Sequence, residues 1–200
     1  MDTNHPVAGL PDPASIQCKG FTLKGALSFV EATYGADARA RVLAAASPET
    51  REVLGGTVLA SALYPFRAQV DLYLAIDKAL GRGDLALCRL IGRFTAEHEL
   101  STIHKITLKV ASLSLWMRSA GRMWNQYYTA GTLVADEFGA TGGRLRVERF
   151  NPISKAFCLD LLGWFERTAE LSGKSGVAVE HPRCLLDGHG ACLFEARWKP

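Results

Sequence analysis

The sequence predicts an α+β protein in which helices pack on a small antiparallel sheet. Up to about Tyr128, apolar residues recur at three- and four-residue steps, which is the spacing of amphipathic helices. The last third contains short runs in which apolar and polar residues alternate, as they do in half-buried strands. Helices therefore come first, followed by a hairpin, a helix and two strands. This order indicates an α+β domain.

Composition favours a compact protein with an ordinary hydrophobic core. The 200 residues carry a formal net charge of +3 and are 48% hydrophobic, which is enough to build a core without disulfides. Residues 1–14 are expected to form a flexible tail, and residues 15–200 a single domain. The charge is too near neutral to indicate a nucleic-acid surface.

Cellular location is predicted from what the sequence lacks. No apolar run reaches the ~18 residues needed for a membrane span. The first residues do not have the basic start and apolar stretch of a secretory signal. An odd number of cysteines at irregular spacing favours reduced thiols, so a cytoplasmic protein is expected.

The helical part begins after a short strand that is expected at Ile16–Phe21. Glycine and proline mark the ends of the helices, and serine, threonine or aspartate marks their starts. One helix opens at Ser47-Pro48-Glu49, because serine caps a helix and proline suits its first turn. The other expected helices are Thr22–Tyr34, Asp37–Ala45, Phe66–Leu80, Asp84–Leu100 and a stretch from Ser101 to Tyr128 in two pieces.

The C-terminal part is expected to contain a hairpin, a helix and two strands. The hairpin strands are Gly131–Ala135 and Arg144–Phe150, with a glycine-rich loop between them. The helix after Ser154 has an apolar stripe that includes Cys158, so that cysteine lies on its buried side. From Cys192 to Trp198 the pattern alternates, which places Cys192 on the core side of the last strand. Cys184 lies in the loop before this strand.

The C-terminal pattern Cys158…Cys184-Leu-Leu-Asp-Gly-His-Gly-Ala-Cys192-Leu-Phe-Glu-Ala-Arg resembles the end of the 4-vinyl reductase domain family. That family shares a superfamily with haem–nitric-oxide-associated sensor modules and vesicle-tethering TRAPP subunits. The match runs roughly from Pro65 to Trp198, and the whole chain resembles a group of myxobacterial proteins of the same layout. The resemblance implies a small-molecule sensor domain, often dimeric, with a metal beside its pocket.

In such sensors the metal ligands are a helix cysteine, a carboxylate before the loop and two cysteines that flank the loop. Cys158, Cys184 and Cys192 match three of these positions. The fourth position holds His181 here, and Glu180 lies one residue away. Strand alternation turns His181 inward with the valines and Glu180 outward, so His181 is preferred and Glu180 is the alternative. Thiolates with an imidazole favour zinc. The competing interpretation is that these cysteines are small buried apolar side chains.

A ligand pocket is expected among the aromatic and histidine side chains between residues 94 and 128, because such side chains line apolar pockets. An ordinary helical core would show the same residues. Haem is not expected, since a lone histidine on a helix is more often structural or exposed. The candidate ligand-binding residues are Phe94, His98, His104, Trp116, Trp124 and Tyr128.

No phosphate loop, nucleophile elbow or carboxylate pair is present, so no catalytic residues are predicted. We expect a non-enzymatic sensor that binds a small hydrophobic or aromatic ligand and acts through a regulatory protein partner or its own homodimer. The alternative is a TRAPP-like scaffold protein with an acyl-sized channel. A reductase ranks below both, because a family name carries no chemistry.

Overall fold

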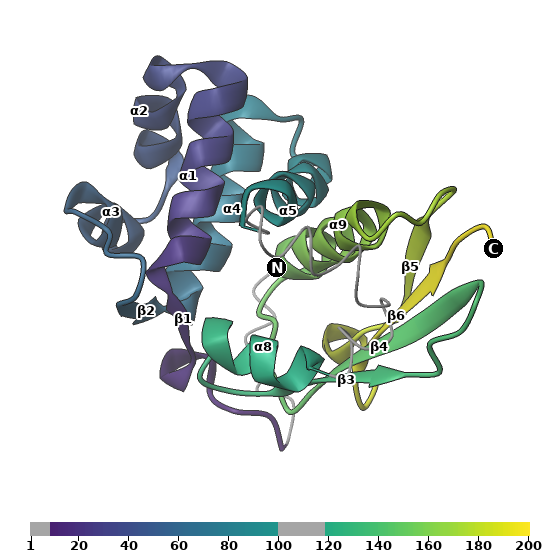
Figure 1. Ribbon diagram of the computed structural model, residues 1–200. Coiled ribbons are helices and arrows are strands. Elements are labelled where there is room, and N and C mark those ends of the chain that lie inside the picture. Colours follow the sequence, from purple (N-terminus) through teal and green to yellow (C-terminus); the bar gives the residue numbers. More distant parts are fainter. Residues whose placement is uncertain (1–8, 100–118) are drawn as a thin grey trace.

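The computed structural model describes residues 9–99 and 119–200, and it confirms the predicted α+β fold class (Figure 1). An N-terminal group of helices and a four-stranded antiparallel sheet lie on either side of one long helix, α9 (Lys155–Leu171). No helix within the described ranges is long and apolar enough to cross a membrane. Residues 1–8 of the expected tail, and the expected helical residues 100–118, lie outside the described part.

The N-terminal half forms a helical layer closed by a small two-stranded sheet. Ser47 caps α3 as expected, since its Oγ accepts a hydrogen bond from Thr50 N at 3.2 Å. α4 is the most buried helix of this layer, with α1, α2, α3 and α5 around it. The elements are β1 (Gln17–Lys19), α1 (Gly20–Tyr34), α2 (Ala36–Ala45), α3 (Pro48–Gly55), β2 (Leu63–Pro65), α4 (Phe66–Leu80) and α5 (Ala86–Glu99).

The C-terminal half contains the four-stranded sheet. Its strand order is β3-β4-β6-β5, and all neighbours are antiparallel. Arg146 Nε donates to Asp136 Oδ2 at 2.6 Å across the β3–β4 hairpin, which ties together the two strands before and after the glycine-rich loop. The elements are α8 (Ala120–Tyr127), β3 (Thr132–Asp136), β4 (Gly142–Glu148), α9, β5 (Ala178–Arg183) and β6 (Cys192–Arg197).

α9 packs unusually closely against α5 because two glycines face the partner backbone. A Cβ on Gly92 of α5 would lie 1.9 Å from the carbonyl oxygen of Asp160. A Cβ on Gly163 of α9 would lie 2.0 Å from the carbonyl oxygen of Arg89. Glu166, whose side chain is 3% exposed, accepts hydrogen bonds from Arg89 and Arg93 beside this crossing. The position of α9 relative to the helical layer is therefore fixed by backbone contact and by buried charge.

The other face of α9 and its N-terminal end pack into an aromatic core. Phe66, Phe150 and Phe157 have ring centroids 4.8–5.3 Å apart in every pairing. Trp124 and Tyr128 of the α8 region pack against the same group. The pairs that Phe66 forms with Phe150 and Phe157 are edge-to-face, and such pairs contribute about 0.5–1.5 kcal/mol each beyond their burial. This aromatic core joins the helical layer, α8 and α9.

Candidate functional site

Four potential metal ligands meet where α9 reaches the β5–β6 end of the sheet. Cys158 comes from the first turn of α9, His181 from β5, Cys184 from the residue after β5 and Cys192 from the start of β6. One ligand atom from each of the four lies within 4.8 Å of all the others. The sequence thus brings together residues up to 34 positions apart, because a helix, a strand end and a second strand converge there.

The thiols are almost completely enclosed. Cys184 lies between the other two cysteines, with its Sγ 3.8 Å from Sγ of Cys158 and 3.8 Å from Sγ of Cys192. All three are buried, at 1–2% exposure. All five cysteines of the chain are free, and Cys18 and Cys88 lie elsewhere in the core. The spacing at Cys184 is that of thiols around a common centre rather than of a bonded pair.

The histidine in this cluster lies at an irregularity in β5. The β5–β6 register shifts between Glu180 and Arg183, so His181 and Pro182 form a bulge. The His181 ring stacks on Phe194, with centroids 4.4 Å apart and planes 7° apart. Its Nε2 is buried and makes no hydrogen bond. Glu180 points outward, with its side chain 65% exposed. Of the two alternatives, the structure brings His181 to the cysteines.

Cys184 is the central residue of the thiol cluster, because its Sγ contacts Sγ of both other cysteines. Hydrogen bonds from the thiols of Cys158 and Cys192 hold the pKa of Cys184 well below its usual range. The hydrogen bond to Cys184, followed by that to Cys192 and by burial, raises the pKa of Cys158. The pKa of Cys192 is raised to about 12: its contact with Cys158 opposes the rise, but the bond to Cys184 and burial outweigh it. A zinc ion would favour the thiolate form of all three cysteines, since thiolates are among its preferred ligands.

Lys155 adds a positive charge beside the cluster. Partial burial alone would lower the pKa of its ammonium group, but hydrogen bonds to Asp187 and to Cys184 raise it. A site with three thiolates and one imidazole around a divalent ion carries a net negative charge, which this ammonium group offsets. The donor set, the unpaired buried Nε2 of His181 and the nearby cation together fit a metal ion. Sequence reasoning missed Lys155. Its position three residues before Cys158 on a helix indicated that the two side chains lie close together.

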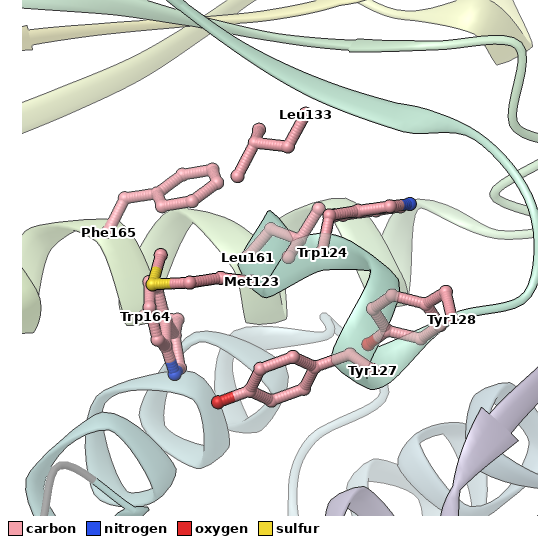
Figure 2. Close-up of a pocket in the computed structure, with 8 residues that line it drawn as sticks. All are labelled: Met123, Trp124, Tyr127, Tyr128, Leu133, Leu161, Trp164 and Phe165. Carbon is pink, nitrogen blue, oxygen red and sulfur yellow. The ribbon is translucent and has the colours of Figure 1, made fainter. Parts of the chain in front are cut away.

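A second feature, an apolar pocket, lies between α8, β3 and α9 (Figure 2). The cavity measures about 50 Å³. Leu133 and Phe165 face each other on the sheet side, and the side chain of Met123 lies alongside Trp164 (Figure 2). The lining consists of Met123, Trp124, Tyr127, Tyr128, Leu133, Leu161, Trp164 and Phe165.

The expected ligand-binding residues are distributed over three places. Trp124 and Tyr128 line the pocket. Phe94 and His98 lie together on α5, where the His98 ring stacks on Phe94 at 3.9 Å and its Nδ1 contacts the Phe94 carbonyl oxygen at 2.8 Å. His104 and Trp116 lie outside the described residues.

Sequence reasoning missed the contribution of α9 to the pocket. Leu161 and Phe165 stand on the same stripe as Cys158, and that spacing indicated a buried face but not what the face covers.

Comparisons with known proteins identify the fold. No family model matches the chain, and no curated protein matches it. An H-NOX protein from S. oneidensis in the Fe(II)NO ligation state is similar at TM-score 0.70 and 14% identity, over 91% of this chain and 99% of that chain. An unliganded Fe(II) H-NOX mutant from K. algicida is similar at TM-score 0.67 and 14% identity, over 91% and 97%. The Fe(II)CO H-NOX domain from Shewanella oneidensis gives TM-score 0.67 and 14% identity, over 90% and 98%. The chain therefore has an H-NOX-like fold.

These neighbours correct one prediction. Haem was not expected, and that prediction is wrong for this fold, because H-NOX domains are haem-binding proteins whose iron is described here with NO, with CO and unliganded. A lone histidine is a weak signal in a sequence, since only the fold shows whether a haem-sized space faces it. Within the described ranges the pocket lining contains no histidine, and His98 is exposed on α5. The described residues thus supply no axial histidine at the pocket.

Proposed function

We propose that this chain is a non-enzymatic sensor module that binds a small apolar or aromatic molecule beside a structural zinc site. The observation that carries the proposal is the position of the aromatic pocket and the Cys158–His181–Cys184–Cys192 cluster on one helix, α9. The H-NOX-like fold and the resemblance of the C-terminal pattern to 4-vinyl reductase domains support the same assignment. Output would pass to a regulatory protein partner or through a homodimer.

The chemistry of the pocket supports binding rather than catalysis. Its walls are apolar side chains and aromatic rings, which exclude water and recognise shape. The cluster has the composition of a closed structural site, with four protein ligands for a tetrahedral ion such as zinc and no open position for a substrate. Such a site contributes to folding rather than to a reaction.

The size of the pocket limits the ligand. A cavity needs about 10–15 Å³ to hold a water molecule on the same scale. At about 50 Å³, the pocket holds a few small atoms as it stands. A single-ring ligand would have to move a side chain, and Met123 is the one best suited, because an unbranched thioether adapts its shape at low cost. The apolar lining favours a neutral ligand, and the small volume limits that ligand to about one ring.

Fluorobenzene is a suitable neutral probe of one ring. We expect saturable binding in fluorine NMR, and tighter binding, by roughly five- to tenfold, for Met123→Ala, because removing about three heavy atoms makes room for the ring. Leu90→Ala is the control, since Leu90 is 48% exposed on α5 and should leave the affinity unchanged. Equal, unsaturable signals in all three proteins would contradict the proposal. A Soret band in the absorption spectrum of the purified protein would replace the proposed ligand with haem.

A homodimer is part of the proposal. Leu59, Leu63 and Leu74, on and around β2 and α4, are 59%, 43% and 38% exposed, and they would be covered in a dimer through the helical layer. We expect light scattering at micromolar concentration to give twice the mass of one chain. A mass near 21.7 kDa, that of the single chain, would rule out the dimer.

A further inference from the structure

Helix α9 places a metal ligand and two pocket residues on one face. Cys158, Leu161 and Phe165 are separated by three and four residues, so they project from the same side of the helix. Cys158 belongs to the thiol cluster, while Leu161 and Phe165 line the pocket. All three are buried, at 1%, 8% and 4% exposure. Helix α9 thus contributes side chains to both the cluster and the pocket.

Strand β6 makes a second connection between the same two places. Cys192 and Phe194 are two residues apart, so both face the core. Phe194 stacks on the His181 ring at 4.4 Å and meets the edge of Phe165 at 5.1 Å and 72°. Phe194 is 1% exposed. A continuous row of rings therefore runs from the metal ligand His181, through Phe194, to the pocket wall at Phe165.

We infer that metal binding at the cysteine–histidine cluster and ligand binding in the aromatic pocket are energetically coupled, and that Phe194 carries the coupling. This inference rests on the proposed function, because it needs both sites to be occupied in the working protein. Phe194 is a positioning residue, because it stacks on the His181 ring and is not among the residues that line the pocket.

The physical reason is close packing. Protein interiors have few voids, so a side chain held between two neighbours transmits a displacement of one to the other. A metal ion fixes the His181 ring, the ring fixes Phe194, and Phe194 limits where Phe165 can lie. A ligand that needs a particular position of Phe165 then binds better when the metal is present. Coupling of this kind is reciprocal, so the ligand strengthens metal binding by the same factor.

The test uses protein loaded with cobalt(II) in place of zinc, because the visible d–d bands of cobalt(II) report the coordination geometry of the site. Addition of fluorobenzene to this protein is expected to shift the bands along the same saturation curve as the fluorine NMR signal. In Phe194→Leu, the metal content should stay unchanged and fluorobenzene should still bind, but the bands should no longer move. The matched control is Phe29→Leu, an equally conservative change at a 4% exposed residue that packs on Tyr34 and Phe94.

A second measurement gives the size of the coupling. The Kd of fluorobenzene is compared between loaded and chelator-treated protein, with near-UV circular dichroism to select conditions where both are folded. We expect the Kd to rise roughly tenfold on metal removal in the wild type and in Phe29→Leu, within the usual range of coupling factors. In Phe194→Leu the rise should fall to about twofold or less.

The outcomes separate the two ideas. Saturable fluorobenzene binding with unmoved cobalt bands and equal Kd values in the wild type would overturn the coupling and leave the proposed function standing. Coupling of equal size in wild type and Phe194→Leu would overturn the role of Phe194. Absence of saturable binding in every protein and metal state would overturn the proposed function and, with it, this inference.

Discussion

Replacement of His181 by alanine is expected to abolish stoichiometric metal binding, whereas Glu180→Ala keeps it. His181 brings a buried nitrogen without a hydrogen bond to the three thiols, and Glu180 is 65% exposed. The free energy of binding at a structural zinc site is of the order of 10 kcal/mol in small peptides, and it adds to the folding free energy. The zinc content measured by elemental analysis should fall from about one ion per chain in the wild type to nearly zero in the histidine variant.

The same pair of variants separates loss of metal from general damage. The melting temperature of His181→Ala should fall by roughly 10 °C, because part of the binding free energy is lost from the folded state. Loss of an exposed carboxylate should change stability by within about 0.5 kcal/mol. If the alanine variant of Glu180 loses the metal and that of His181 retains it, the assignment of the fourth ligand is wrong. An absence of metal from all three proteins, the wild type included, would remove the metal site from the proposed function.

Gly92→Ala is expected to destabilise the protein by about 2 kcal/mol or more. The new methyl group would lie 1.9 Å from the carbonyl oxygen of Asp160, so α5 and α9 would have to separate. Alanine gains up to about 1 kcal/mol in helix propensity, which offsets only part of this cost. The expected loss lowers the melting temperature by roughly 5 °C for a chain of this length.

The control for this variant is Gly55→Ala at the end of α3, where a Cβ meets no atom within 4 Å. That change should be neutral or stabilising by up to about 1 kcal/mol, because it reduces the freedom of the unfolded chain. Urea denaturation of both variants gives the two free energies of unfolding. Equal stability of Gly92→Ala and the wild type would show that the two helices do not approach as closely as described.

Much of the fold could be predicted because it follows from local patterns. The expected helix Phe66–Leu80 has those bounds in the structure, since Pro65 and Gly81 delimit a clear apolar periodicity. The strand β2 was not predicted, because its three residues are defined only by pairing with β1, more than 40 positions earlier. Local pattern contains no information on such a partner.

The metal cluster was more predictable from the sequence than the pocket, because local patterns show which way a side chain points but not which segments meet. The period of two in β5 and β6 indicated that His181 and Cys192 point inward, and the structure places both side chains in one cluster. The pocket depends on how α8, β3 and α9 meet, which no single segment reveals. Phe94 and His98 are therefore residue types that suit an apolar pocket, but they lie on α5 and are not part of the pocket lining.

The bulge in β5 also affects how this protein can associate. β5 is an edge strand of the four-stranded sheet, and an exposed edge is a template for pairing with a strand of another molecule. Pro182 has no N–H to donate, and the shifted register at His181 and Pro182 interrupts the regular row of backbone groups. The irregularity at the histidine of the cluster thereby also protects this edge from strand addition, and with it from aggregation through β5.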